Sequence, residues 1–133
     1  MTLYVDSSAL LKRYVDERDS EFAEQAMGDD PVLVTSRITE IEVRRNLTRL
    51  LDGDELLVAQ RAFDADVDHF ALVEVDAVTC AEAARLAEQT LCRSLDAVHL
   101  ACARRAGART VVLTFDRRQA RAARAIGLEV IGA

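Results

Sequence analysis

Leu3-Tyr4-Val5-Asp6-Ser7-Ser8 is the stretch of this chain that decides its fold. Strand-favouring residues lead to an acid and two serines, and the apolar Ala9-Leu10-Leu11 follows, so the pattern predicts a buried strand, a cap and a helix. Asp6 then stands at the carboxyl end of a strand, which is the edge where open α/β sheets bind ligands. A plain helix cap at Asp6 or Ser7 would explain the same pattern, and this stretch alone does not decide between a cap and a ligand.

Strand-like and helix-like segments alternate along the rest of the chain, and Pro31 ends the second helical segment. Strands that alternate with helices form parallel βαβ units. We therefore predict an α/β fold, a three-layer sandwich whose central parallel sheet is flanked by helices, with the apolar segment 110–114 at the sheet centre. The predicted strands are 3–5, 32–34, 71–75, 110–114 and 128–131, and the predicted helices are 9–15, 22–27, 38–51, 56–70, 78–92, 95–106 and 117–126.

The chain has the size and composition of one domain, residues 1–133. Although 50% of its residues are hydrophobic, it contains no run of 18 apolar residues and no signal-peptide pattern, so we expect a cytoplasmic protein without a membrane span. The three cysteines lack C-x-x-C spacing, which argues against a zinc site or a disulfide framework and favours buried, reduced thiols.

The charge distribution permits a nucleic-acid partner despite the net charge of −6. Residues 52–88 hold ten acids and two arginines, whereas residues 104–124 hold seven arginines and one acid. Sixteen of the seventeen basic residues are arginine, whose planar guanidinium suits phosphate better than the lysine ammonium does. One face of the protein could therefore bind a polyanion. A solvated helix face would account for the same run of arginines.

Glu42 is a second acid that could belong to a site with Asp6. It lies at the margin of the apolar face of the helix predicted over 38–51, where a surface glutamate is unusual. An ordinary i, i+3 ion pair with Arg45 would also account for it. The residues assigned to that apolar face are Ile38, Ile41, Leu47, Leu50 and Leu51.

Asp96 and Asp116 complete a group of four acids. Asp96 interrupts an otherwise apolar helix start, where it needs a partner if buried, although a first-turn acid is also favoured by the helix dipole. Asp116 follows the strand 110–114 and could simply cap the next helix. Parallel strands bring Asp6 and Asp116 to the same sheet edge, which the helices carrying the other two acids should border. His99, three residues after Asp96, could be a ligand or a residue that supports one, but it is more simply a packed helix histidine.

Convergent carboxylates repel one another unless a cation is present. Oxygen ligands suit magnesium or manganese, which bind through a few carboxylates and substrate phosphate. Such an ion activates water and neutralises charge on a phosphodiester, so the predicted reaction is metal-assisted phosphodiester hydrolysis. Two histidines without a nucleophile motif give no Ser-His-Asp alternative.

Four segments along nearly the whole chain resemble the PIN-domain family, and most closely its VapC ribonuclease toxins of VapBC toxin–antitoxin pairs. The match depends on the order and spacing of the segments together, because each of them alone is a weak signal. They are Tyr4-Val5-Asp6-Ser7-Ser8-Ala9-Leu10, Thr35-Ser36-Arg37-Ile38-Thr39-Glu40-Ile41-Glu42, Ser94-Leu95-Asp96-Ala97-Val98-His99-Leu100-Ala101 and Val112-Leu113-Thr114-Phe115-Asp116.

The resemblance implies a PIN-like fold and a magnesium- or manganese-dependent endoribonuclease that acts on RNA as the toxin of a type II toxin–antitoxin system. It also implies a homodimer and a small VapB-like antitoxin as partner. The implied metal ligands are Asp6, Glu42, Asp96 and Asp116, supported by Ser7 and Thr114. Many family members carry Asn before the last acid and a further acid after it, where this chain has Phe115 and Gln119, so the number of metal ions stays open.

Closeness in sequence to the four acids suggests which arginines contact RNA phosphate. A catalytically silent PIN-like interaction or regulatory module is the alternative function. An aspartyl-phosphate chemistry at Asp6, like that of the haloacid dehalogenase family, is disfavoured because Ser8 stands where those enzymes place a second Asp. The predicted phosphate contacts are Arg44, Arg45, Arg93, Arg117 and Arg118.

Overall fold

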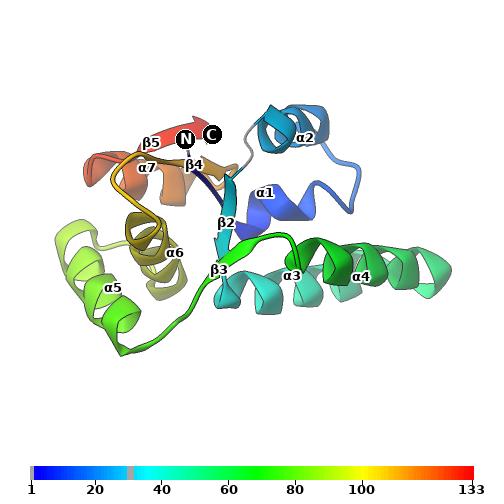
Figure 1. The fold of residues 1–133 in the computed structure, drawn as a ribbon, viewed down its shortest axis with the longest axis horizontal. Helices are drawn as coiled ribbons and strands as arrows, with labels where there is room; N and C mark the ends of the chain where they lie inside the picture. Colours follow the sequence, from blue (N-terminus) through cyan, green and yellow to red (C-terminus); the bar gives the residue numbers. More distant parts are fainter. Residues whose placement is uncertain (1, 30–31) are drawn as a thin grey trace.

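The structure is a computed structural model that describes residues 2–29 and 32–133, so the helix end predicted at Pro31 lies outside it. Within these residues strands and helices alternate as the sequence predicts, although the first helix is shorter than expected (Figure 1). The elements are β1 (Thr2–Val5), α1 (Ser7–Leu11), α2 (Ser20–Asp29), β2 (Val32–Ser36), α3 (Arg37–Leu50), α4 (Gly53–Val67), β3 (Ala71–Val73), α5 (Ala77–Thr90), α6 (Ser94–Arg105), β4 (Thr110–Thr114), α7 (Arg117–Ala125) and β5 (Glu129–Gly132).

The five strands form one parallel sheet in the order β3-β2-β1-β4-β5, with β1 at its centre. Thr2 of β1 stands opposite Val32 of β2 on one side and Thr110 of β4 on the other. The prediction that 110–114 is the central strand is wrong, although all five residues of β4 are buried. Burial marks any strand that has neighbours on both edges and helices on both faces, so it does not identify the middle one.

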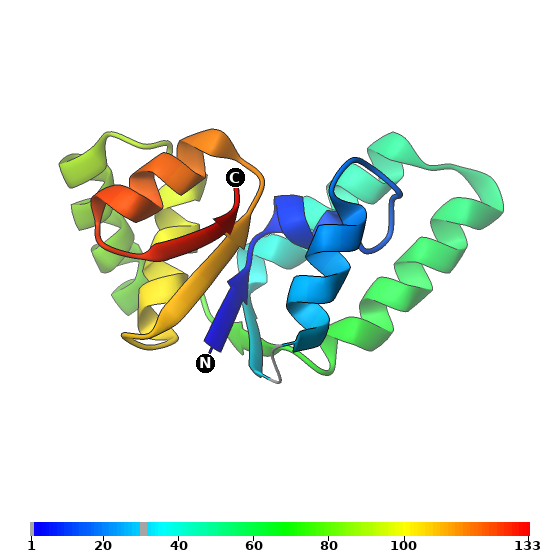
Figure 2. The same cartoon turned by 90° about the horizontal axis from the view of Figure 1, so that it is seen from above.

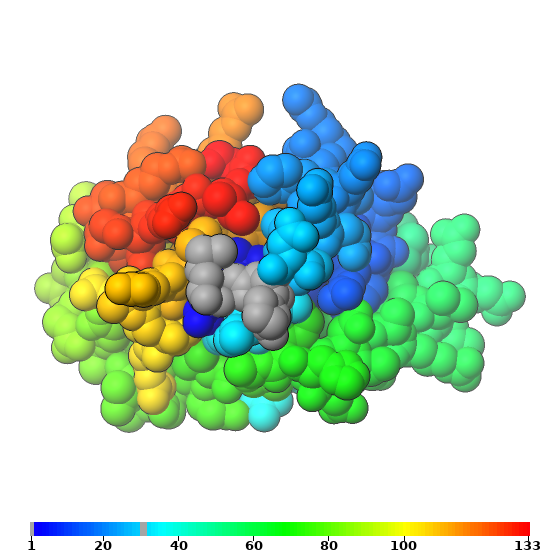
Figure 3. All heavy atoms as spheres, turned by 45° about the horizontal axis from the view of Figure 1, so that its top comes forward, coloured from blue at the N-terminus to red at the C-terminus, as the bar shows by residue number. Residues whose placement is uncertain are grey.

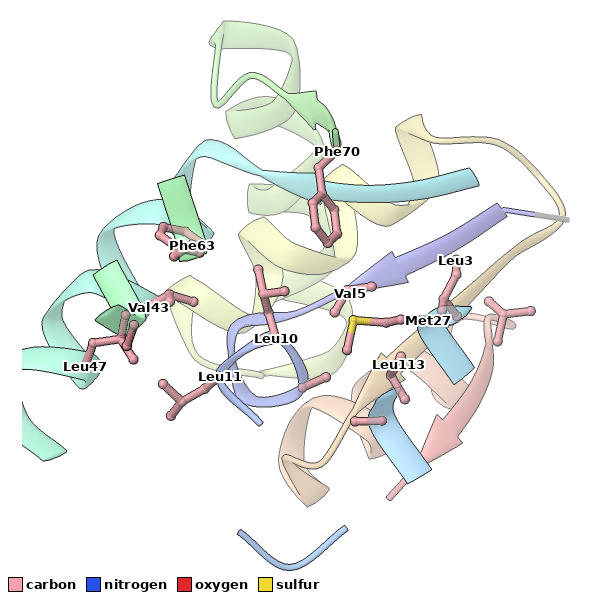
Figure 4. Close-up of a cluster of buried hydrophobic side chains, with 14 residues drawn as sticks. Leu3, Val5, Leu10, Leu11, Met27, Val43, Leu47, Phe63, Phe70 and Leu113 are labelled. Carbon is pink, nitrogen blue, oxygen red and sulfur yellow. The ribbon is translucent and has the colours of Figure 1, made fainter. Parts of the chain in front are cut away.

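Alternate residues of the central strands enter two separate cores. Leu3 and Val5 pack with Leu113 against helices α1 to α4, as Figure 4 shows. Tyr4 and Val112 point to the opposite face, toward α6. Seen from above, α1 to α4 lie on one side of the sheet and α5 to α7 on the other (Figure 2). The predicted three-layer α/β sandwich, typical of PIN-like proteins, is therefore confirmed.

Phe115, which follows β4, packs against α2. Its ring meets Phe22 edge-on with the ring centroids 6.2 Å apart, and Lys12 Nζ lies 4.7 Å from the Phe115 centroid. In Figure 3, α2 in blue accordingly lies beside the orange and red segment that runs from α7 to β5. The residue that departs from the family pattern before Asp116 thus has a packing role in this chain.

The predicted apolar face of α3 is wrong in part. The residues that α3 buries are Thr39, Val43 and Leu47, whereas Ile41 is 66% exposed and Leu50 is 41% exposed. The spacing of four residues sets one buried stripe, and a small polar residue, Thr39, occupies its first position. Apolar character alone therefore indicated the wrong stripe.

Two further sequence predictions concern membrane spans and thiols. Among the described residues, every helix is too short or too polar to cross a bilayer. All three cysteines are free, as predicted, but only Cys102 is buried and Cys80 is exposed. Burial raises the pKa of the Cys102 thiol to about 11, so that thiol is protonated at neutral pH.

Leu47→Ala is expected to destabilise the protein by about 2–5 kcal/mol, because it opens a cavity in the core beneath α3. Leu50→Ala, one turn further along the same helix, should change the free energy of unfolding by less than about 0.5 kcal/mol. Urea denaturation of both variants measures the two values. Equal losses would contradict the assignment of the buried stripe.

Candidate active site

Asp6 is both a helix cap and a wall of a pocket. Its Oδ1 accepts hydrogen bonds from the Ala9 backbone N–H at 2.9 Å and from the Ser8 hydroxyl at 2.7 Å. Its Oδ2 accepts from Thr114 Oγ1 at 2.5 Å, across the ends of the neighbouring strands β1 and β4. The two explanations that the sequence left open for Asp6 are therefore compatible, since capping uses one oxygen and leaves the carboxylate at the sheet edge.

Burial dominates the electrostatics of Asp6, which is 2% exposed. Desolvation raises the pKa of its carboxyl group above the ordinary value, and the charge of His99 and the hydrogen bonds from Thr114 and Ser8 oppose that rise. The net direction is upward. A nearby cation would remove the cost of this buried negative charge.

Glu42 faces the same pocket from α3 and is held by two donors. Ser7 Oγ donates to Glu42 Oε1 at 2.7 Å, and His99 Nε2 lies 2.5 Å from the same oxygen. The alternative i, i+3 pair with Arg45 is absent from the described contacts, where Arg45 bonds to Asn46 instead. Burial alone would raise the pKa of Glu42, but the hydrogen bond and charge of His99 and the Ser7 hydrogen bond lower it overall.

His99 connects Glu42 to a buried tyrosine. Because a carboxylate only accepts hydrogen bonds, Nε2 of the ring carries the proton that Glu42 receives. In the neutral ring Nδ1 is then an acceptor, and the Tyr4 hydroxyl lies 2.8 Å from it. The preferred prediction of a packed histidine is correct as to burial, at 2% exposure, and the alternative of a residue that supports a ligand describes its contact with Glu42.

Arg93 joins the other two acids. Its Nε donates to Asp96 Oδ2 at 3.1 Å and its Nη2 donates to Asp116 Oδ2 at 3.2 Å. The hydrogen bond to Asp96 and the charge of that carboxylate raise the pKa of Arg93. Asp96 also lies in the first turn of α6, and Asp116 caps α7 by accepting from the N–H groups of Arg118 and Gln119. Both acids thus have the ordinary helix roles that the sequence allowed, as well as a place in the site.

All four acids line one pocket of about 310 Å³, which we call the acidic pocket. They reach it from the ends of β1 and β4, from the second turn of α3 and from the first turn of α6. Ser7 lines the acidic pocket, whereas Thr114 holds Asp6 from behind. The residues lining it are Asp6, Ser7, Ser8, Glu42, Arg93, Ser94, Leu95, Asp96, His99, Asp116 and Gln119.

The donor set of the acidic pocket fits a hard cation in its chemistry, because it consists of carboxylate and hydroxyl oxygens. Within residues 2–29 and 32–133, no three carboxylate, imidazole or thiol groups are close enough together to enclose a metal ion. Hydrogen bonds hold each carboxylate to the pocket wall, and the Arg93 guanidinium supplies the positive charge between two of them. Metal binding would therefore require small side-chain shifts toward the centre of the pocket.

Gln119 is a pocket residue that lacks a partner. It is 2% exposed, and its Nε2 makes no hydrogen bond with the described residues. A buried unsatisfied polar group calls for a water, an ion or a ligand. The Gln119 amide stands where many family members have a further acid. The site of this chain therefore carries one negative charge fewer than the sites of those members.

The predicted arginines are distributed unevenly around the site. Of the five, only Arg93 lines the acidic pocket, and Arg118 lines the pocket next to it. Arg44 is paired with Asp64 on α4 at 2.6 Å, and neither Arg45 nor Arg117 lines the acidic pocket. Tyr4 contacts His99 and Ser8 contacts Asp6, and neither residue was predicted to belong to the site. Ser8 could have been found as the hydroxyl two residues after Asp6, but no signal in the sequence marks the hydroxyl of Tyr4.

Comparisons with known proteins agree with this geometry. The PIN-domain family matches residues 3–125 of the chain. Ribonuclease VapC35 of Mycobacterium tuberculosis is 36% identical over 134 residues, which cover 97% of this chain and 95% of that protein. The crystal structure of FitAcB from Neisseria gonorrhoeae has a TM-score of 0.75 at 18% identity, covering 97% and 96% of the two chains. A toxin–antitoxin complex from Klebsiella pneumoniae has a TM-score of 0.68 at 18% identity and covers 87% of each chain.

Asp6→Asn is expected to raise the melting temperature of the metal-free protein at pH 7, because it removes a buried charge. A carboxyl group whose pKa is raised by folding stabilises the protein below its ordinary pKa, and this contribution is lost as the pH rises to the folded value. The advantage of Asp6→Asn should therefore shrink as the pH falls toward about 4. Thermal scans in a chelator measure it, with the exposed Asp64→Asn as control, and a less stable Asp6→Asn at pH 7 would contradict the argument.

Tyr4→Phe is expected to cost about 1–3 kcal/mol of stability, because it leaves His99 Nδ1 buried without a donor. It should also change the ring nitrogen chemical shifts of His99 in NMR spectra. Tyr14→Phe is the matched control, since it removes the hydroxyl that bonds Asp66 at 2.7 Å far from the acidic pocket. If the His99 shifts respond equally to both variants, the Tyr4 contact is not what fixes the ring.

Proposed function

Because this chain belongs to the PIN-domain family, and within it to the VapC ribonucleases, we propose that it is a magnesium-dependent endoribonuclease, with manganese as a possible substitute, that acts as the toxin of a type II toxin–antitoxin pair. One observation carries the proposal. Asp6, Glu42, Asp96 and Asp116 come from four separate parts of the chain and line the same pocket. Four acids without a common task would have no reason to meet there.

The same four carboxylates are the proposed ligands of the metal. When bound, a divalent ion lowers the pKa of a coordinated water and neutralises charge that develops on the phosphodiester. The raised pKa of Asp6 supports a cation at this place, because that carboxylate is buried and Arg93, which lines the same pocket, is paired with Asp96 and Asp116 instead. The neutral Gln119 reduces the charge available for a second ion.

The chain's own residues orient these ligands. Thr114 fixes one oxygen of Asp6, and Ser7 with His99 fixes one oxygen of Glu42. Such partners keep a ligand in a single orientation and contribute strongly to metal affinity. Arg93 is exposed on its outer side and lies between Asp96 and Asp116, so it can exchange a carboxylate for a phosphate oxygen of the RNA.

A structural neighbour supports an antitoxin as one partner of this chain. The matched Klebsiella pneumoniae structure is a toxin–antitoxin complex, which supports a small VapB-like antitoxin as the partner of this chain. We further propose a homodimer, with residues 1–133 forming a single PIN domain in each subunit. Exposed apolar residues on α3 and α4, such as Ile41 and Val58, are available for such contacts.

The alternative function is a catalytically silent PIN-like module that only binds other proteins or regulates them. Its four acids would need no metal, and the buried Asp6 would then be a cost without a benefit. Aspartyl-phosphate chemistry is disfavoured further by the structure, because both oxygens of Asp6 already accept hydrogen bonds and Ser8 is one of the donors.

Asp96→Asn is expected to lower magnesium-dependent RNA cleavage by at least about 100-fold. It removes the negative charge of a proposed metal ligand and leaves the shape of the side chain nearly unchanged. Cleavage is measured by mapping new RNA ends after incubation with and without magnesium, and in growing cells by growth arrest. Asp64→Asn is the control, because Asp64 is an exposed acid paired with Arg44 away from the pocket.

Two outcomes would contradict the proposed function. Full cleavage by Asp96→Asn would exclude the acidic pocket as the active site. A wild-type protein that binds its partner but never cuts RNA in magnesium or manganese would establish the silent module instead.

A further inference from the structure

A second pocket, of about 520 Å³, adjoins the acidic pocket and carries the opposite charge. It lies between α7 and the connection from α5 to α6, and we call it the basic pocket. Arg93 and Asp96 line both pockets, so the two are adjacent at these residues. The basic pocket adds Arg118 and Arg121 from α7.

The charges of the basic pocket are available for a ligand. Arg118 and Arg121 form no ion pair with the described residues, whereas Arg37, Arg44 and Arg105 elsewhere on the surface each have an acid within 2.8 Å. α7 contains four arginines and no acid. The positive field at this place is therefore not neutralised by the protein itself, and arginine forks match phosphate oxygens in geometry.

The shape of the basic pocket comes from one face of α7. Arg118, Arg121, Ala122 and Ala125 recur at helical spacing, so they line the same side of the helix. The two alanines leave room between the arginines and the α5–α6 connection. The resulting volume is within the range of pockets that bind small ligands or single ligand groups.

Leu91 is an unusual residue at the edge of the basic pocket. Its backbone is left-handed, with φ 57° and ψ 23°, at the C-cap of α5, and its side chain is 88% exposed. Glycine or asparagine is the usual residue in such a cap, because a β-carbon is strained there. Leucine at this position weakens the fold and presents an apolar surface next to two free arginines.

We propose that the basic pocket binds a backbone phosphate of the RNA strand next to the one positioned in the acidic pocket, with the neighbouring base lying on Leu91. This inference rests on the proposed function and names a subsite for its substrate. Adjacency to the acidic pocket favours RNA over a protein ligand, because one strand can place successive phosphates at both pockets. Arg93 lies at the junction, between the acids and the free arginines.

RNA binding in a chelator tests the subsite separately from metal-dependent cleavage. The probe is a fluorescein-labelled 12-nucleotide single-stranded RNA, titrated with the full chain at several salt concentrations. Arg118→Ala and Arg121→Ala are each expected to weaken binding and to lower the slope of log affinity against log salt by about 0.7. Arg109→Ala is the control, because it removes the same charge from the exposed loop before β4, outside both pockets.

Leu91→Gly distinguishes an effect on RNA binding from an effect on the stability of the fold. Glycine relieves the left-handed backbone, so the melting temperature should stay unchanged or rise. RNA binding should nevertheless weaken about fivefold, since the apolar contact with a base is lost. A variant with a raised melting temperature and unchanged RNA affinity would remove Leu91 from the subsite.

The proposal is overturned if Arg118→Ala and Arg121→Ala bind RNA with the same salt slope as Arg109→Ala. It is overturned in favour of a protein ligand if those two variants keep RNA binding but lose binding of a glutamate-rich 12-residue peptide. If both variants lose RNA binding while the wild type never cleaves RNA, the subsite is supported and the proposed function fails. If the wild type cleaves RNA and both variants behave like the control, the subsite alone fails.

Discussion

The hydrogen bond from Thr114 to Asp6 is the contact on which the rest of the site depends. It joins the ends of β1 and β4, whose parallel pairing places Val5 opposite Leu113 and so brings the next residues of both strands to one edge. Because both residues are buried, the bond forms in a medium of low dielectric, where it is strong and where its loss would leave a charge unsatisfied. The backbone thus positions the first acid before any ligand arrives.

The negative charges of the other three acids are stabilised in two different ways. Glu42 is held by two donors, Ser7 and His99, and the network ends at the buried hydroxyl of Tyr4. Asp96 and Asp116 instead share the single positive charge of Arg93, which is half-exposed. The side of the site formed by the sheet is buried and held by hydrogen bonds, whereas the side formed by α6 and α7, where the basic pocket begins, depends on one half-exposed arginine.

Much of the fold followed from local patterns, and the errors have a common physical origin. The alternation of apolar strands and amphipathic helices predicted the parallel sheet, because each element can bury its apolar side only against another layer. The same patterns misplaced the centre of the sheet and the buried stripe of α3. Both depend on which elements pack against one another. Ile41 is exposed because none of the described elements covers it, and nothing in the sequence around Ile41 indicates this.

The sequence by itself determined which acids stand at strand and helix ends, because capping and strand-end positions are set by residues next to each other in the chain. Only the tertiary structure decided that Asp6 and Asp116 cap helices and also line one pocket. It also decided that His99 contacts Glu42, which is 57 residues away in the sequence. The departure of Gln119 was visible in the sequence, but its unpaired amide was not. Contacts between distant segments arise from packing, which no short stretch of sequence encodes.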